Sequence, residues 1–226
     1  MTTLITYAGP GAPGAAVTRI GGLPLAPPGT AWPTCAECGG PLRFLAQFRL
    51  DGTGSVLAGG GRRRRRAYAY VLALFACQNR LGVCRDWSAD SGANTALLLP
   101  ARGLRRLARP RGGTVGGEVD VEKLLLGATH AVEPYEAAEA DYDAACAAWA
   151  ARTGRPRNDV LGRLGGPPAW LQCDRTPACP DCAEPMRSVV QLQEGPDPLT
   201  AMNFGTGRAY AFACVPCGEA AFLWQC

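Results

Sequence analysis

Eleven cysteines are the residues of this chain whose type and spacing could do chemistry, and eight of them fall into four close sets. In the second half of the chain, Cys179 and Cys182 are followed, after 31 residues, by Cys214 and Cys217. Zinc takes four ligands in a tetrahedron, so two hairpin knuckles that each present two thiolates can close around one ion. A centre closed by four thiolates is structural, because catalytic zinc keeps a position open for water or substrate. The spacing therefore predicts a structural zinc ion held by these four cysteines.

A second set in the first half has the same form. Cys35 and Cys38 make a C-x2-C, and the two glycines that follow let the backbone turn tightly enough for amide groups to point at the thiolates. Cys77 and Cys84 complete the set, with six residues between them. This spacing is wider than is usual for a zinc knuckle, which makes Cys84 the least secure of the eight predicted ligands. We expect two structural Zn²⁺ ions in total.

Other uses of cysteine fit the pattern less well. An iron-sulfur cluster also takes four cysteines, but ferredoxin-type ligands are clustered in sequence rather than split into distant pairs. A redox C-x-x-C opens a helix after a strand, whereas glycine or proline turns surround these pairs. A disulfide scaffold is usually short, and an odd count leaves one thiol unpaired. Of the three remaining cysteines, we expect Cys146 to be buried, Cys226 to be exposed, and assign no role to Cys173.

Residue patterns that indicate catalysis are largely absent. The chain has no P-loop, no G-x-S-x-G and no H-E-x-x-H motif. Its single histidine, His130, has no catalytic partner that the sequence identifies. We therefore predict no catalytic residues, no organic cofactor and no enzymatic activity.

The cysteine sets belong to a unit that occurs twice. Arg19–Gln47 matches Arg163–Gln191 without a gap, and ten of the 29 positions are identical. A second match follows, because RAYAYVLALFAC (Arg66–Cys77) resembles RAYAFAC (Arg208–Cys214). Each copy therefore contains a C-x2-C, a strand-like segment and a further cysteine pair. The predicted fold is mainly β (α+β): two pseudo-symmetric zinc-stapled β repeats with one connecting helix.

The repeats divide the chain into three parts. Residues 1–118 form the first zinc-binding β repeat, with an Arg-rich insert at 51–66 that is too low in complexity to bury apolar area. Residues 119–157 connect the repeats and carry a helix at about 133–152. Residues 158–226 form the second zinc-binding β repeat.

The helix is predicted from its stripe of apolar residues and its ends. Tyr135, Tyr142 and Trp149 fall near one face at helical spacing, and acidic residues concentrate in the first half, where they favour the helix dipole. Gly154, followed closely by proline, is expected to end the helix.

The sequence predicts two strands that flank the cysteine knuckles and a third extended segment at the N-terminus. Arg43–Leu50 reads as a strand with Phe44, Ala46 and Phe48 on one face. The apolar run 67–77 suits a central strand that delivers the cysteine at its end. Residues 1–16 alternate small residues with glycine and proline, which predicts an edge strand or a loosely held arm.

Composition and the distribution of apolar and charged residues indicate the class of protein and its location. In 226 residues, 47% are hydrophobic, which is enough to build a core. No apolar run reaches about 18 residues, and the N-terminus lacks the basic and apolar regions of a signal peptide, so we expect a cytoplasmic protein without a membrane partner. The net charge is +4, and the arginine runs Arg62–Arg66 and Arg102–Arg111 could bind phosphate or an acidic partner. Nucleic-acid binding through these segments is therefore an alternative function.

Taken together, the motifs of the chain resemble those of known families. The chain contains a GG-x-P near a tryptophan, followed by C-x-x-C, a strand with F-L-x-Q character and R-x-Y-x-F-x-C. This series of motifs resembles the programmed cell death protein 2 family. The chain is also similar to the bacterial YwqG-like family of uncharacterised proteins. The matching residues are Ile20–Pro24, Cys35, Cys38, Pro41, Leu42, Phe44–Gln47, Gly165–Leu171, Cys179, Cys182, Pro185, Met186, Gln191 and Arg208–Cys214.

The resemblance implies two related β-rich zinc domains without enzymatic activity. The eukaryotic family looks like a dedicated chaperone of a small-subunit ribosomal protein. This chain departs from the family in its Arg-rich insert, in the helix between the halves and in the position of Cys84. We therefore expect a non-enzymatic zinc protein that binds a protein or peptide, such as a basic or ribosomal protein. An immunity or antitoxin-type binding role is a variant of the same expectation.

Overall fold

The computed structural model describes residues 1–12, 17–50, 69–79, 82–110, 126–195 and 202–226. The predicted Arg-rich insert at 51–66 lies outside them. In the described residues the fold is mainly β, with one helix whose bounds are defined, α2 (Tyr142–Thr153), and a 3-10 turn, η1 (Arg157–Asp159). The strands are β1 (Thr2–Pro10), β2 (Arg19–Ile20), β3 (Leu25–Ala26), β4 (Arg43–Leu50), β5 (Tyr70–Ala76), β6 (Asn94–Pro100), β7 (Arg105–Arg106), β8 (His130–Ala137), β9 (Val160–Leu164), β10 (Arg187–Gln193), β11 (Arg208–Cys214) and β12 (Glu219–Gln225).

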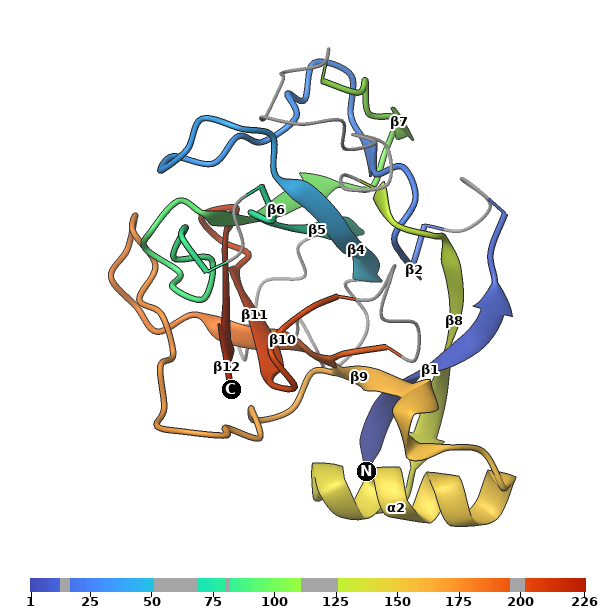
Figure 1. The fold of residues 1–226 in the computed structure, drawn as a ribbon. Coiled ribbons are helices and arrows are strands. Elements are labelled where there is room, and N and C mark those ends of the chain that lie inside the picture. The colour runs from blue at the N-terminus through green and yellow to red at the C-terminus, as the bar shows by residue number, and fades with distance from the viewer. Residues whose placement is uncertain (13–16, 51–68, 80–81, 111–125, 196–201) are drawn as a thin grey trace.

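Ten of these strands form one sheet that nearly closes on itself. Its order is β12-β11-β10-β9-β1-β8-β2-β4-β5-β6, while β3 and β7 form a separate pair. The pair β1 and β8 lies in the middle, the first half of the chain supplies β2, β4, β5 and β6, and the second half supplies β9 to β12 (Figure 1). The sheet curls until its edge strands β6 and β12 lie against each other. The interior cluster accordingly mixes both halves, with Phe48 and Leu74 packed in one core with Leu192 and Phe222.

The N-terminal segment takes a central position, so its prediction as an edge strand or loose arm is wrong. β1 pairs antiparallel with β8 on one side and with β9 on the other. Its adjacent residues Leu4 and Ile5 are both buried, one against α2 and one in the interior of the sheet. A strand that is paired along both sides of its backbone lies inside the sheet rather than at its edge.

The helix is shorter than the predicted 133–152. Residues 133–137 belong to β8, and their pairing with β1 overrides the helical pattern. The helix begins after Asp141, whose side chain caps it by accepting a hydrogen bond from Ala144 N at 2.8 Å. The predicted end is confirmed, because Gly154 is the C-cap in the left-handed conformation (φ 69°). The segment 119–157 thus contributes a strand to the middle of the sheet as well as the helix.

A β-bulge changes the predicted faces of β4. The register with β5 shifts between Phe44 and Ala46, so Phe44 packs outside the sheet with Leu42, while Ala46 and Phe48 face the interior. The prediction that all three share a face is therefore wrong, because a bulge resets the alternation of a strand. β10 has the corresponding shift between Ser188 and Val190, 144 residues later.

The two segments that match in sequence also make matching hydrogen bonds. In both, the backbone after the paired glycines turns back to the first long strand, and the first glycine of each pair has a positive φ, 65° at Gly21 and 63° at Gly165. The corresponding bonds are Gly21 N to Leu45 O (2.8 Å) and Gly165 N to Val189 O (2.6 Å), and Leu25 N to Gln47 Oε1 and Ala169 N to Gln191 Oε1 (both 2.8 Å). Trp32 anchors the end of the loop 21–33, because its Nε1 donates to Leu42 O at 2.8 Å.

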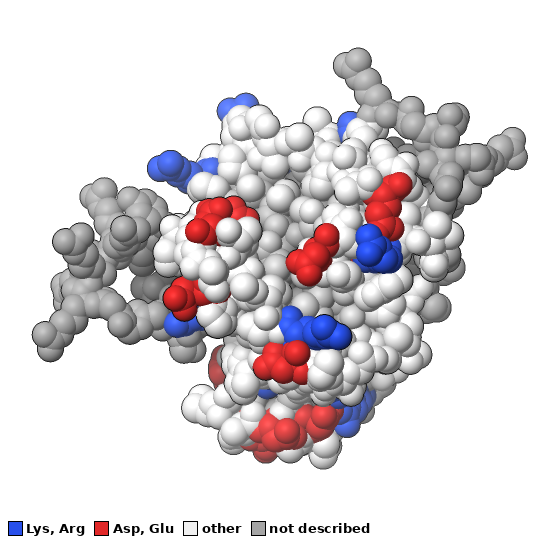
Figure 2. Space-filling model, turned by 90° about the vertical axis from the view of Figure 1, so that its left-hand side faces the viewer, with Lys and Arg blue, Asp and Glu red and all other residues white. Residues whose placement is uncertain are grey.

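The cysteine-bearing loops gather on one side of the molecule, at the left in Figure 1. Figure 2 views this side, where acidic and basic side chains stand in small groups among uncharged surface. Among the described residues, no helix is both long and apolar enough to cross a membrane.

Candidate metal centres

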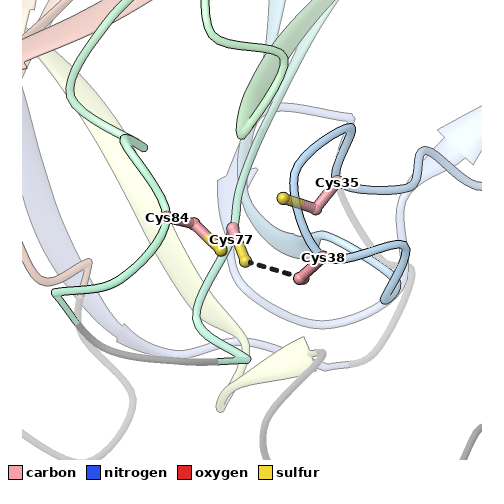
Figure 3. A group of neighbouring side chains, drawn as sticks. All are labelled: Cys35, Cys38, Cys77 and Cys84. Atoms are coloured by element: carbon pink, nitrogen blue, oxygen red, sulfur yellow. Dashed lines mark hydrogen bonds between the residues drawn. The ribbon is translucent and has the colours of Figure 1, made fainter.

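The first centre gathers the sulfurs of Cys35, Cys38, Cys77 and Cys84 within 4.8 Å of one another. Two come from the loop before β4, one follows β5 directly, and Cys84 comes from the loop that leads on to β6 (Figure 3). The Sγ atoms of Cys38 and Cys77 are 3.7 Å apart. Four sulfurs bound at about 2.3 Å in a tetrahedron stand about 3.8 Å from each other, so this spacing fits a single ion.

Local hydrogen bonds shape the first knuckle. Leu42 N donates to Pro33 O at 2.9 Å and Cys35 N to Gly40 O at 2.8 Å, which closes a small hairpin. Gly39 N then donates to Cys35 O at 2.8 Å, with Gly39 in the left-handed region at φ 73°. Glycine adopts this conformation at no steric cost, so the C-x2-C-G-G sequence folds into the turn that brings both sulfurs to one side.

The second centre gathers Cys179, Cys182, Cys214 and Cys217, again with all four sulfurs within 4.8 Å. The Sγ atoms of Cys182 and Cys214 are 3.8 Å apart. The hairpin between β11 and β12 supplies the second pair, and Gly218 N closes that turn by donating to Cys214 O at 2.9 Å.

The knuckle of the second centre has the same backbone hydrogen bonds as the knuckle of the first. Met186 N donates to Pro177 O and Cys179 N to Glu184 O, both at 2.8 Å. Ala183 stands where the first knuckle has Gly39 and keeps the left-handed conformation at φ 60°. This conformation is unfavourable for alanine, so the turn must be imposed by the surrounding hydrogen bonds and the cysteine pair.

The two centres differ in exposure. In the first, Cys35, Cys77 and Cys84 are buried and Cys38 is half-buried. In the second, only Cys179 is buried, while Cys182 is exposed and the other two are half-buried. Solvent and chelators therefore reach the second centre more easily.

Asn79 supports the first centre and was not identified from the sequence. Its Nδ2 lies 3.3 Å from Cys77 Sγ and 3.5 Å from Cys38 Sγ, and it donates to Pro41 O at 3.2 Å. A Cβ at Gly40 would lie 2.6 Å from this nitrogen, so a glycine there leaves room for the asparagine. Hydrogen bonds to ligand sulfurs orient them and stabilise their charge. The only sequence signal was an asparagine two residues after Cys77.

The surroundings shift the pKa values of the thiols in the first centre in opposite directions. Burial opposes ionisation of Cys38, but the N–H of Gly40 and the side chain of Asn79 outweigh it and lower its pKa to about 7. Burial raises the pKa of Cys77 to about 11 and also raises the pKa of Cys84. Four sulfurs this close cannot all become thiolates without a cation to offset their mutual repulsion.

In the second centre, too, the pKa values of the thiols shift in opposite directions. Burial opposes ionisation of Cys179, but backbone N–H groups of Cys182 and Asp181 outweigh it and lower the pKa of Cys179. Burial raises the pKa of Cys214, and the neighbouring sulfur of Cys214 raises the pKa of Cys217.

The donor sets fit a metal ion. All eleven cysteines are free thiols, and sulfurs 3.7 Å apart are far beyond the disulfide length of about 2.05 Å. Four thiolates in a tetrahedron suit zinc or a single iron, whereas a cluster of several irons needs its cysteines farther apart. The chain thus contains two four-cysteine groups that could each hold one metal ion.

All eight predicted ligands come together, including Cys84, whose spacing had made it the least secure. The other three cysteines lie apart from both groups. Cys146 is buried on α2 beneath the sheet, and Cys173 and Cys226 are exposed. His130 belongs to neither centre and packs its ring against Tyr7, with centroids 5.2 Å apart.

No family model matches the chain. The chain is similar to the uncharacterized protein YpfL of Salmonella typhimurium, with 35% identity over 66 residues. This match covers 29% of the chain and 15% of that protein, so the chain spans only a small part of its relative's length.

Proposed function

We propose that this chain is a non-enzymatic protein in which two structural zinc ions hold a duplicated β unit, and that it binds a protein partner. The observation that carries the proposal is the composition of the two centres. In each, four cysteine sulfurs lie within 4.8 Å of one another, which is enough donors to fill all four positions of a tetrahedral ion. A metal held in this way has no position for water or substrate, so its role is to stabilise the fold.

Zinc is the metal proposed because it accepts four thiolates and has no redox chemistry of its own. Structural zinc sites supply on the order of 10 kcal/mol of apparent folding free energy, against a net stability of about 5–15 kcal/mol for a typical domain. Two such ions would therefore decide whether this fold is stable.

The duplication is supported at the level of individual bonds. The same knuckle hydrogen bonds, the same bulge and the same glutamine contact recur 144 residues apart. Strands β2, β4, β5 and β6 correspond in sheet order to β9, β10, β11 and β12. We infer that both halves descend from one zinc-binding unit, as the resemblance to the programmed cell death protein 2 and YwqG-like families implies.

Exposed apolar side chains support a protein partner. Val83 (65% exposed) and Trp87 (44%) lie in the loop that contains Cys84, and Leu171 (44%) lies in the loop between β9 and β10 that also contains Cys179. Exposed tryptophan and aliphatic residues near a rigid scaffold are typical of protein-binding surfaces. The described residues that line the pocket between Gly166 and Ser188 include no carboxylate or histidine, which gives an enzymatic role no support.

A basic or ribosomal partner follows only from the family resemblance. The acidic segment 133–143 offers less free negative charge than its sequence suggests. Glu139 pairs with Arg152 at 2.5 Å, and Asp143 pairs with Arg208 at 2.8 Å. The proposal therefore places the contact at the apolar loops.

The test combines metal analysis with partner capture. Elemental analysis of freshly purified protein should give two zinc ions per chain; protein that is folded but free of metal would refute the proposal. Tagged wild-type protein and a Trp87→Ser, Leu171→Ser variant are then compared in pull-downs from the native cell, with and without nuclease treatment. A partner lost only with the variant supports the protein-binding role. Recovery of nucleic acid alone, lost at high salt, would instead favour the Arg-rich segments, part of which lies outside the described residues.

A further inference from the structure

We propose that residues Cys84–Ala93, called the strap below, couple the two metal centres, so that metal at one centre raises the affinity of the other. The inference rests on the proposed metal function and adds to it. The strap has no equivalent in the second half, where Cys214 and Cys217 form a tight C-x2-C before β12. The wide spacing of Cys77 and Cys84 and the segment that follows thus distinguish the first centre from the second.

The N-terminal end of the strap is fixed to the first centre. Its first residue, Cys84, is itself one of the four ligands. Arg85 donates through its backbone N (2.9 Å) and Nε (2.7 Å) to the carboxylate of Glu37, which lies between Cys35 and Cys38.

The far end of the strap returns to the same knuckle. Ala36 N donates to Gly92 O at 2.9 Å, and Cys77 N donates to Ala93 O at 2.8 Å. A Cβ at Gly92 would lie 2.7 Å from the Cβ of Ala36, so strap and knuckle are in close contact there. Both ends of the strap are therefore held by residues next to the ligands of the first centre.

The middle of the strap contacts the second half. Trp224 N in β12 donates to Trp87 O at 3.2 Å, and the two rings meet edge to face with centroids 6.5 Å apart. Ala89 packs against the buried cluster that contains one ligand of the second centre, Cys179, and two further ligands, Cys214 and Cys217, pack against the same cluster. The strap thus touches the hairpin β11–β12, which supplies two of those ligands.

These contacts give a physical route for coupling. When a metal holds Cys84, the strap is ordered, and it then supports the β11–β12 hairpin in the conformation that binds the second ion. Loading the second centre fixes the same hairpin and supports the strap in turn. Each ion therefore reduces the ordering cost that the other must meet, which is positive coupling.

The coupling must be reciprocal, and this makes it measurable. One variant removes the first centre (Cys38→Ser with Cys77→Ser), and another removes the second (Cys182→Ser with Cys214→Ser). Zinc affinity of the remaining centre is measured by competition with a chromogenic chelator and compared with the wild-type chain. We expect each loss to weaken the other centre by the same factor, in the usual range of roughly 5- to 150-fold.

A strap variant separates coupling from general stability. Ala89→Arg forces a large charged side chain against the second half while leaving all eight cysteines and Glu37 in place. With it, the coupling factor should fall towards one. The control is Asp90→Asn, a change at the neighbouring exposed position, which should keep the wild-type factor.

The outcomes are distinguishable. A wild-type chain that folds without metal refutes the proposed function itself. Two bound ions with affinities that do not depend on each other refute the coupling alone. If a single-centre variant fails to fold, native mass spectrometry of the wild-type chain at half-saturating zinc replaces it. Chains with no ion or two ions should then predominate, and one-ion chains should increase in Ala89→Arg; an equal share of one-ion chains in both proteins would overturn the inference.

Discussion

The side-chain oxygen of Gln47 accepts a hydrogen bond from the backbone N–H of Leu25 at 2.8 Å, deep in the protein where Gln47 is 0% exposed. Gln191 makes the same bond to Ala169 at 2.8 Å. In each half, a buried glutamine on the first long strand therefore holds the loop that follows the paired glycines. This loop runs on to the first C-x2-C, so the glutamine indirectly positions the knuckle.

Replacing Gln47 by leucine should lower the free energy of unfolding of the metal-loaded protein by about 1–3 kcal/mol for each group left unpaired. The change removes the acceptor for Leu25 N and the donor to Val17 O, which Gln47 Nε2 contacts at 3.0 Å. Gln191→Leu should cost less, because Gln191 Nε2 has no hydrogen-bond partner among the described residues. Urea unfolding of both variants measures the difference. Equal losses would contradict this account.

The metal-binding side of the molecule was largely predictable from the sequence. Cysteine spacing and tight turns are local signals, and the turn of the first knuckle requires a positive φ, which Gly39 adopts without strain. The apolar runs that became β5 and β11 are buried, so their pattern is strong. For these elements, short stretches of sequence contain the physical cause of the structure.

The middle of the sheet was not predictable in the same way. Glu133–Ala137 has a helical pattern, and only its pairing with β1, over 120 residues away in sequence, makes it a strand. The bulge after Phe44 likewise depends on the register with β5. Asn79 and the strap act through contacts with residues distant in sequence. No local pattern contains that information.

Cys84→Ser and Cys77→Ser should each remove one metal ion per chain. The prediction follows from the position of Cys84, whose sulfur lies within 4.8 Å of the other three despite the wide spacing. Elemental analysis of purified variants measures it. Cys173→Ser is the control and should retain two ions, because Cys173 is exposed and belongs to neither centre. Full metal content in Cys84→Ser would exclude it as a ligand.

Asn79→Ala should weaken metal binding at the first centre by roughly 10- to 100-fold, the usual effect of losing a partner that orients a ligand. The variant loses the contacts of Nδ2 with Cys77 Sγ and Cys38 Sγ. The second centre should keep its affinity apart from any effect through the strap. Gln78→Ala is a matched control, because the neighbouring Gln78 bonds to Arg43 and to neither sulfur. Chelator competition compares the three proteins, and equal affinities would contradict a role for Asn79.

Metal affinity at the first centre should rise with pH, and more steeply below about pH 7 than above it. Zinc binds thiolates, so each thiol that must lose a proton adds about a tenfold gain in affinity per pH unit. Cys77, with its pKa raised by burial to about 11, contributes this gain throughout the neutral range. Cys38, with its pKa lowered to about 7, contributes only below that value, since above it the thiolate is already formed.

The same reasoning predicts the effect of Asn79 on this profile. Its side chain is one of the groups that lower the pKa of Cys38, so Asn79→Ala should move the change in slope to higher pH. Chelator competition between about pH 6 and pH 9, on the variant that lacks the second centre, measures the slope directly. A uniform slope in the wild-type first centre, or a break that stays in place when Asn79 is removed, would show that the hydrogen bonds from Asn79 do not set the charge on Cys38.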